Sequence, residues 1–522
     1  TINLGARYEY VSAHREAKGR IDYGFGADKN NIQPRIGFAY SPNQSEGWLG
    51  KLAGGPGRSS IRGGYGIYHG RLFQSVFSQS GATVRFNPPN ALLLTFSNSR
   101  NLADPTDGFV FTPGPQATRH AEAYIDPNLE MPYTQQWNLS VERKLPWRSA
   151  LRMSYTGNRG IGLVRFTQDN VPMSPALGPV TVANHPNNAP TALYSAENRP
   201  AGDPRAVDIR GQQLRLAADP LCAGTGLAGI PTTANCPVPV PIGPNEISVR
   251  VPRINERRPR PEFSGNTVVS NGVWSYYHGL QVEWNKEYTK GLSFQMSYTW
   301  SKSIDTTSEA TFVGAGDSNS LGPDPRVSRG LSRYHSPHRY TFFGAYELPW
   351  YKERKDFAGQ LLGGWKVSMV AKFVAGTPFT VINTNSNTSG DFNYDGFTEN
   401  RPAVVDPGVL GAHFTVPDQA PFRLPRSAFR APTFADLNCC LLGRNTFYGD
   451  GMDNFDFSLF KSFKMPFEGH RLLFRADMLN AFNHVQYGFP ILDLANANFG
   501  RLTGTSVSYT PRNVQISLRY SF

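Results

Sequence analysis

The stretch GLSFQMSYTWS, residues 291–301, decides how the rest of this sequence is interpreted. From Leu292 every second residue is apolar or aromatic, whereas Ser293 and the residues alternating with it are small and polar. Successive side chains of a β-strand point to opposite faces of its sheet, so this period of two predicts a strand with one apolar and one polar face. The closing segment 513–522 repeats the pattern.

The same alternation recurs along the whole chain and predicts an all-β, antiparallel architecture with about twelve strands. Their approximate ranges are 1–11, 32–41, 59–69, 132–145, 149–165, 275–287, 291–303, 334–348, 363–376, 453–463, 471–483 and 512–522. Short turns alternate with long connections, the largest near 70–131, 166–274 and 377–452. Structureless loops of this length are unusual in compact domains, but outer-membrane barrels combine short periplasmic turns with long extracellular loops.

Composition supports a β-architecture and leaves a membrane location open. The 522 residues include Gly 51 and Pro 41, with 39% hydrophobic and 12% aromatic residues, which argues against helical bundles and doubly wound α/β folds. No uninterrupted apolar window is long enough for a transmembrane helix, although barrel strands need only about ten alternating residues. A soluble sandwich alternates similarly, but aromatic residues at strand ends, such as Trp300, Trp350 and Phe522, favour a transmembrane barrel.

Several strand and hairpin phrases together resemble one family, the Oar-like TonB-dependent outer-membrane receptors, in their C-terminal barrel. The phrases are NLGARYEY (3–10), PRIGFAY (34–40), IRGGYGIY (61–68), YTQQWN (133–138), MSYTWSKS (296–303), AGTPF (375–379) and DMLNAFNH (477–484). The resemblance covers nearly the whole chain apart from the long loops. It implies a 22-stranded barrel around an N-terminal plug, driven by the inner-membrane TonB complex.

The sequence departs from this family pattern at its start, because Thr1 already lies inside an alternating segment. We therefore expect residues 1–522 to be a single barrel domain that is truncated at its N-terminus, with the plug, the TonB box and the first strands outside it. Coupling to TonB is then assigned to the parent protein rather than to these residues.

Charged residues at polar positions of the predicted strands are candidates for the barrel lumen. They are Arg7, Glu9, Arg152, Glu283, Arg475, Asp477 and Arg519. A charge facing lipid at mid-bilayer would cost about 2–4 kcal/mol, which supports inward placement. These residues either line a solute path or form a salt-bridged lining that packs against a plug, and we favour the lining.

The last strand carries a candidate signal for the barrel-assembly machinery, which the family resemblance suggests. It consists of alternating apolar residues and a terminal phenylalanine: Val514, Ile516, Leu518, Tyr520 and Phe522. The alternative is an ordinary last strand without such a role.

Two further candidates lie in the long loops. The segment DFNYDG (391–396) matches the start of a calcium loop, so Asp391, Asn393, Asp395 and Glu399 could hold a structural calcium ion, although Pro402 replaces the usual twelfth-position glutamate. The alternative is an Asx-rich turn without metal. Cys222 and Cys236 could form a disulfide in an oxidising compartment or stay as free thiols.

The sequence contains none of the catalytic motifs that we sought for zinc peptidases, serine hydrolases or P-loop enzymes, so we expect no enzyme. The net charge of +12 is scattered, which argues against nucleic-acid binding. The favoured function is import of a bulky, scarce ligand, such as a siderophore, glycan or peptide, across a Gram-negative outer membrane. The alternatives are an outer-membrane structural or adhesion protein and a soluble secreted carbohydrate-binding β-protein. The expected partners are outer-membrane lipid, the TonB complex, the barrel-assembly machinery and the extracellular ligand.

Overall fold

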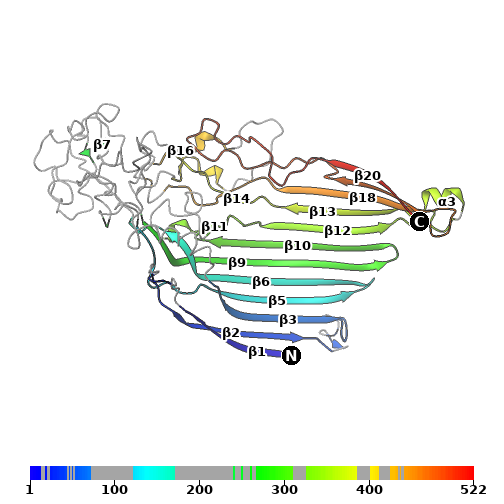
Figure 1. Ribbon diagram of the computed structural model, residues 1–522, viewed down its shortest axis with the longest axis horizontal. Coiled ribbons are helices and arrows are strands. Elements are labelled where there is room, and N and C mark those ends of the chain that lie inside the picture. The colour runs from blue at the N-terminus through cyan, green and yellow to red at the C-terminus, as the bar shows by residue number, and fades with distance from the viewer. Residues whose placement is uncertain are drawn as a thin grey trace, which may run out of the picture.

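Twelve long strands form one antiparallel sheet in which each strand pairs with its neighbours in chain order (Figure 1). The computed structural model describes residues 1–12, 18–19, 24–43, 46–47, 50, 53–71, 122–167, 169–170, 239–240, 249–250, 259–260, 266–309, 325–354, 356–384, 400–410, 424–432, 436 and 440–522. The long strands are β1 (Ile2–Val11), β2 (Asp28–Tyr40), β3 (Ser59–His69), β5 (Tyr133–Leu145), β6 (Ser149–Thr167), β9 (Asn266–Thr289), β10 (Leu292–Asp305), β12 (His338–Glu347), β13 (Lys366–Val374), β18 (Met452–Lys464), β19 (Arg471–Leu479) and β20 (Asn513–Ser521).

Short elements complete the fold at the margins of this sheet. β4 (Glu122–Ile125) pairs with β9 in parallel, and β11 (Gly330–Leu331) pairs with β10. Three two-stranded pairs are β7 (Pro239–Val240) with β8 (Val249–Arg250), β14 (Pro378–Phe379) with β17 (Phe447–Tyr448), and β15 (Ala403–Val404) with β16 (Phe429–Arg430). The helical turns are α3 (Phe357–Leu362), η6 (Pro325–Ser328), η8 (Pro407–Val409) and η9 (Arg426–Ala428). No helix among the residues listed above is long and apolar enough to cross a membrane.

The tightest connections lie at one end of the sheet. At one end β5 and β6 are joined by residues 146–148, and β9 and β10 by residues 290–291. In Figure 1 these short turns lie at the end marked by α3, and β11, β14 and β16, which belong to longer connections, lie toward the opposite end. Backbone twist at the tight turns requires positive φ at Trp147, Arg148 and Lys290, each near +50 to +60°.

The strand register sorts side chains into an apolar face and a polar face. One row across the sheet joins Leu151, Trp284, Met296, Phe342, Ala371 and Phe455. The adjacent row on the other face joins Glu142, Arg152, Glu283, Ser297, Thr341 and Lys372. From β6 to β18 the two faces therefore keep their character, whereas on β5 the apolar row ends at Arg143, which pairs with Leu151.

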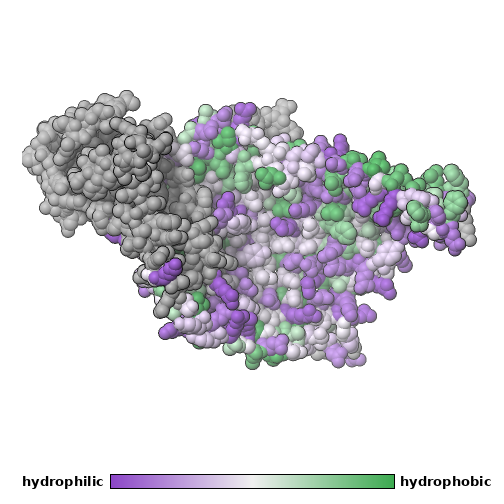
Figure 2. Space-filling view, in the orientation of Figure 1, coloured by the Kyte–Doolittle hydropathy of each residue, from purple (hydrophilic) through white to green (hydrophobic). Residues whose placement is uncertain are grey.

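The large apolar side chains of this sheet are exposed rather than buried. Leu4 is 77% exposed in β1, and Ile516 is 66% exposed in β20. In Figure 2 hydrophilic and intermediate residues cover much of the visible middle of the sheet, and hydrophobic residues gather at its short-turn end near α3. A face with this much exposed apolar surface requires an apolar environment.

The buried apolar core lies in the long connections instead of between layers of the sheet. It joins residues from the β13–β18 and β19–β20 connections: Phe379, Val381, Val409, Leu424, Ala428, Phe429, Leu442, Phe447, Leu494 and Phe499. We call these residues the loop core. Phe447 is fully buried and its ring lies 5.9 Å from Phe379 and 5.8 Å from Phe429.

The twelve predicted strands are confirmed, with two differences in the connections. β9 begins at Asn266, nine residues before the predicted strand, because its first residues extend the pairing with β6 and with β4. The connection near 377–452 is not structureless in its described parts, since it contributes most of the loop core. The core also draws on the connection between β19 and β20, which the sequence pattern did not single out.

The assignment of the faces predicts that an arginine destabilises the protein strongly at one position and little at the next. Met296→Arg places a cation at the centre of the apolar face and should lower the free energy of unfolding by about 2–4 kcal/mol. Ser297→Arg points to the polar face, beside Glu283, and should change it by less than about 1 kcal/mol. Urea titration of the refolded protein in lipid vesicles measures both values, and equal effects would contradict the assignment.

Candidate functional site

The polar face carries acidic and basic side chains that pair with one another across neighbouring strands. Arg152 on β6 lies between Glu142 on β5 and Glu283 on β9, with nitrogen–oxygen distances of 3.6 Å to each carboxylate. The Gln281 amide donates a 2.7 Å hydrogen bond to Glu283. The side chains of Arg152, Glu142 and Glu283 are 21–44% exposed, so they border solvent space while balancing each other's charge.

The other predicted lumen residues also lie on the polar face. Arg7 and Glu9 form a 2.5 Å ion pair on β1. Arg475 pairs with Asp477 at 2.8 Å on β19, and the Ser458 hydroxyl of β18 donates to the same carboxylate. Arg519 lies on β20 opposite Leu473, on the face away from Leu518 and Tyr520. The sheet thus brings all seven residues onto one wall, and their role in a lumen stays a prediction.

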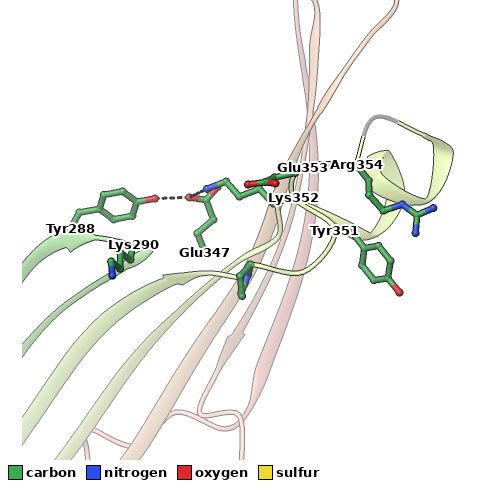
Figure 3. Close-up of a pocket in the computed structure, with 9 residues that line it drawn as sticks. Tyr288, Lys290, Glu347, Tyr351, Lys352, Glu353 and Arg354 are labelled. Carbon is green, nitrogen blue, oxygen red and sulfur yellow. Dashed lines mark hydrogen bonds and ion pairs between the residues drawn. The ribbon is translucent and has the colours of Figure 1, made fainter.

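A pocket of about 600 Å³ opens at the short-turn rim of the sheet (Figure 3). The Tyr288 hydroxyl donates to a Glu347 carboxylate oxygen at 2.5 Å, and the Lys352 ammonium lies 3.3 Å from the same oxygen. Figure 3 shows Tyr288 and Lys352 converging on Glu347, whereas Tyr351 and Arg354 turn away. The aromatic residues of this turn were visible in the sequence, but the convergence on Glu347 depends on strand pairing and was not predicted.

A buried ion pair fixes the loop core to the long-connection end of β10. The Arg444 guanidinium, 2% exposed, pairs with Asp305, which is 6% exposed. Arg444 also donates to the backbone carbonyls of Ser328 at 2.8 Å and Asp305 at 2.7 Å. Because these contacts satisfy the guanidinium from several directions, the loop cannot shift without leaving a buried charge unpaired.

Further polar contacts connect the two long connections that build the loop core. The Thr384 amide donates to Asp493 at 3.0 Å, and its hydroxyl donates to the same carboxylate. Burial alone would raise the pKa of Asp493, but these hydrogen bonds hold it below its ordinary value. Burial, with a smaller effect from the charge of Arg444, lowers the pKa of Arg401 to about 10.

The remaining predicted sites have different outcomes. Asp391, Asn393, Asp395 and Glu399, like Cys222 and Cys236, lie outside the described residues, so the calcium loop and that disulfide stay predictions. Within the described part of the chain no three His, Cys, Asp or Glu side chains are grouped as a metal site would require. Cys440 is disulfide-bonded.

The candidate assembly signal is presented on the apolar face of β20. Its five side chains are 49–92% exposed, from Tyr520 to Phe522. This exposure makes them available to a lipid or protein surface, and recognition by the barrel-assembly machinery stays a prediction.

Most of the sequence matches one protein family. Residues 22–515 match the outer membrane beta barrel domain, and the chain belongs to this family. The apolar face is therefore the lipid-facing surface of an outer-membrane barrel. The match confirms the predicted fold class and the outer-membrane location, and the alternative of a soluble secreted protein is wrong.

Two solved outer-membrane proteins are similar to the chain at low sequence identity. The outer membrane transporter YddB from Escherichia coli is 10% identical with a TM-score of 0.41, and the match covers 94% of this chain and 41% of that protein. The ferric-catecholate import receptor Fiu from Escherichia coli K12 is 9% identical with a TM-score of 0.34, covering 94% and 35%. The chain spans about two fifths or less of these proteins. No curated protein matches its sequence.

Removing the counter-charge of Arg444 should loosen the loop core. Asp305→Asn leaves a buried guanidinium without its anion, at a cost of about 3–5 kcal/mol. Hydrogen exchange of the amides in 440–451, followed by mass spectrometry in detergent, should become faster. Glu309→Gln breaks the partly exposed pair with Arg333 and serves as the control, with an expected change under about 1 kcal/mol. Unchanged exchange in Asp305→Asn would show that the ion pair does not hold the loop.

The long-connection end should lose stability in mild acid through His335. Burial lowers the pKa of this imidazole, and the charges of Lys302 and His338 lower it further. Between the ordinary pKa of 6.5 and the lower folded value, the unfolded state binds a proton that the folded state does not. Stability contributed by the neutral ring is therefore present above 6.5 and lost as the pH falls below it. The fall in Tm between pH 7.5 and 5.5 should be smaller in His335→Gln than in the parent protein.

Proposed function

We propose that the chain is the barrel part of a TonB-dependent outer-membrane receptor that imports a bulky, scarce ligand such as a siderophore, glycan or peptide. The observation that carries the proposal is the polar wall with its compensated charges, from Arg7–Glu9 on β1 to Arg475–Asp477 on β19. A barrel of twelve or more strands encloses more space than its own side chains fill, so this wall borders water or an inserted segment.

The charge pattern of the wall suits passage of a large solute rather than selection of small ions. Acidic and basic side chains alternate around Arg152 and are not gathered into a ring of one sign. Rings of one sign are what select ions in channels. A wetted, self-compensated wall lets a solute or a plug move past without leaving a buried charge unpaired.

The loop core supplies a rigid platform at the extracellular end of the barrel. Its buried aromatic residues and the Arg444–Asp305 pair hold the two long connections in one arrangement. Preorganised loops lose less conformational entropy on binding, which favours capture of a dilute ligand. The connections near 70–131 and 166–274 complete the proposed capture surface. No covalent chemistry is part of this function.

The same platform favours a second function, in which the barrel anchors an adhesive surface. A loop region with its own core and buried ion pair can also withstand contact with another cell or with matrix. Outer-membrane lipid and the barrel-assembly machinery are proposed partners in both cases, and TonB is a partner only in the first.

Deletion of the gene in its native host should separate the two functions. Accumulation of radiolabelled ferric siderophores, oligosaccharides and oligopeptides is measured with and without a protonophore, alongside attachment to surfaces. We expect loss of protonophore-sensitive accumulation of one ligand class, restored by the intact gene but not by one lacking codons 171–238. Unchanged accumulation of all classes together with lost attachment would overturn import in favour of adhesion.

A further inference from the structure

A second pocket, of about 630 Å³, lies at the long-connection end of the sheet, between β6 and β9. Two arginines and two aromatic rings define it. The Arg159 guanidinium lies 5.2 Å from the centre of the Tyr276 ring, and the Arg329 guanidinium lies 5.7 Å from the centre of the Trp274 ring. The two rings meet edge to face at 5.2 Å. We call this set of four residues the basic–aromatic pocket.

The register places this pocket on the lipid-facing side of the barrel. Arg159 pairs with Tyr276, as Leu151 of the apolar face pairs with Trp284. Arg159 and Leu151 are an even number of residues apart on β6, and Tyr276 and Trp284 are an even number apart on β9, so all four lie on the same face of the sheet. The register shift of β6 begins only after Gly160, so it does not change the face on which Arg159 lies. Beyond this shift, Gly162 and Gly272 have positive φ of 62° and 119° and line the pocket without side chains.

The pocket lies beyond the upper edge of the apolar belt. On β10 the belt runs from Leu292 to Trp300, which spans roughly 27 Å along the strand, or about 20 Å along the membrane normal at a tilt of about 40°. The row of Arg159 and Tyr276 meets β10 at Ile304, four residues further on. This is about 10 Å above the Trp300 row, at the depth of the outer-leaflet headgroups.

The chemistry of the pocket is that of an anion site with an apolar wall. Within the described ranges the guanidinium groups of Arg159 and Arg329 make no ion pair, and both residues are exposed. Lys302 adds a third exposed cation one row nearer the belt, on the same face. Arginine guanidinium groups bind phosphate through paired hydrogen bonds, and stacking on an aromatic ring orients them for this.

We propose that the basic–aromatic pocket binds the phosphorylated headgroup of an outer-leaflet glycolipid. Arg159 and Arg329 contact the phosphate, and Trp274 and Tyr276 contact the sugar or upper acyl carbons. Continuity with the lipid-facing belt favours a lipid over a free solute, because acyl chains of the same molecule can lie on Tyr155 and Leu280 below.

The test compares binding of lipid A to the detergent-solubilised full chain and to its Arg159→Gln/Arg329→Gln variant. Each surface cation changes headgroup affinity about five-fold, so the double variant should bind about 30-fold more weakly. Arg339→Gln removes the same charge from the polar face of β12 and should leave the affinity unchanged. Native mass spectrometry reads bound lipid directly, and an unchanged affinity in the double variant overturns the proposal.

Two further measurements identify the source of the phosphate and guard against misfolding. Dephosphorylated lipid A should bind the parent and the double variant equally weakly, whereas full competition by millimolar inorganic phosphate would overturn a lipid ligand in favour of a free anion. Arg329 lies outside the long strands, so the single substitution Arg329→Gln leaves the strand pairing intact. It should weaken lipid A binding about five-fold. The Arg159→Lys/Arg329→Lys variant should bind more tightly than the double glutamine variant but more weakly than the parent, because lysine keeps the charge and loses the paired hydrogen bonds and ring stacking.

Discussion

Continuous backbone hydrogen bonding from β1 to β20 is the constraint on which the rest of this structure depends. Lipid offers no partner for an unpaired N–H or C=O, so each strand within the membrane must be paired along its length. Antiparallel order with neighbours in sequence satisfies this with the shortest connections. Once the ladder is fixed, the period of two dictates which residues meet lipid and which meet water.

This constraint moves the buried core away from the sheet. In a soluble protein Met296 and Phe342 would face a second layer, whereas here lipid takes the place of that layer. The loop core is instead built where the chain leaves the membrane, and the Arg444–Asp305 pair ties it to the last residue of β10. The sheet in the membrane and the connections beyond it are therefore stabilised by separate sets of contacts.

The sequence predicts the strands and their faces because both depend on neighbours one or two positions away. Arg152 could be placed on the polar wall from alternation alone, but its two carboxylate partners depend on the pairing of three strands. The ion pair that ties the loop core to β10 could not be predicted, since Asp305 and Arg444 are 139 residues apart and nothing periodic relates them. Arg159 could be predicted in part. The even spacing from Leu151 places it on the apolar face from sequence alone, but the position of Arg329 in the same pocket does not follow from the sequence.

Lys461 is one of the charged residues on the lipid-facing side, and its surroundings show how a turn can support such a charge. Lys461 shares a row with Phe474 and Leu518 on the apolar face, yet it is only 4% exposed. Its ammonium donates to the Gln360 carbonyl of α3 and lies 5.5 Å from the Trp365 ring and 4.8 Å from the Phe463 ring. The β12–β13 turn thus shields a cation that lipid would otherwise contact. A short helix at the rim is therefore part of what makes the apolar face compatible with the membrane, because it supplies the carbonyl and aromatic surface that this charge requires.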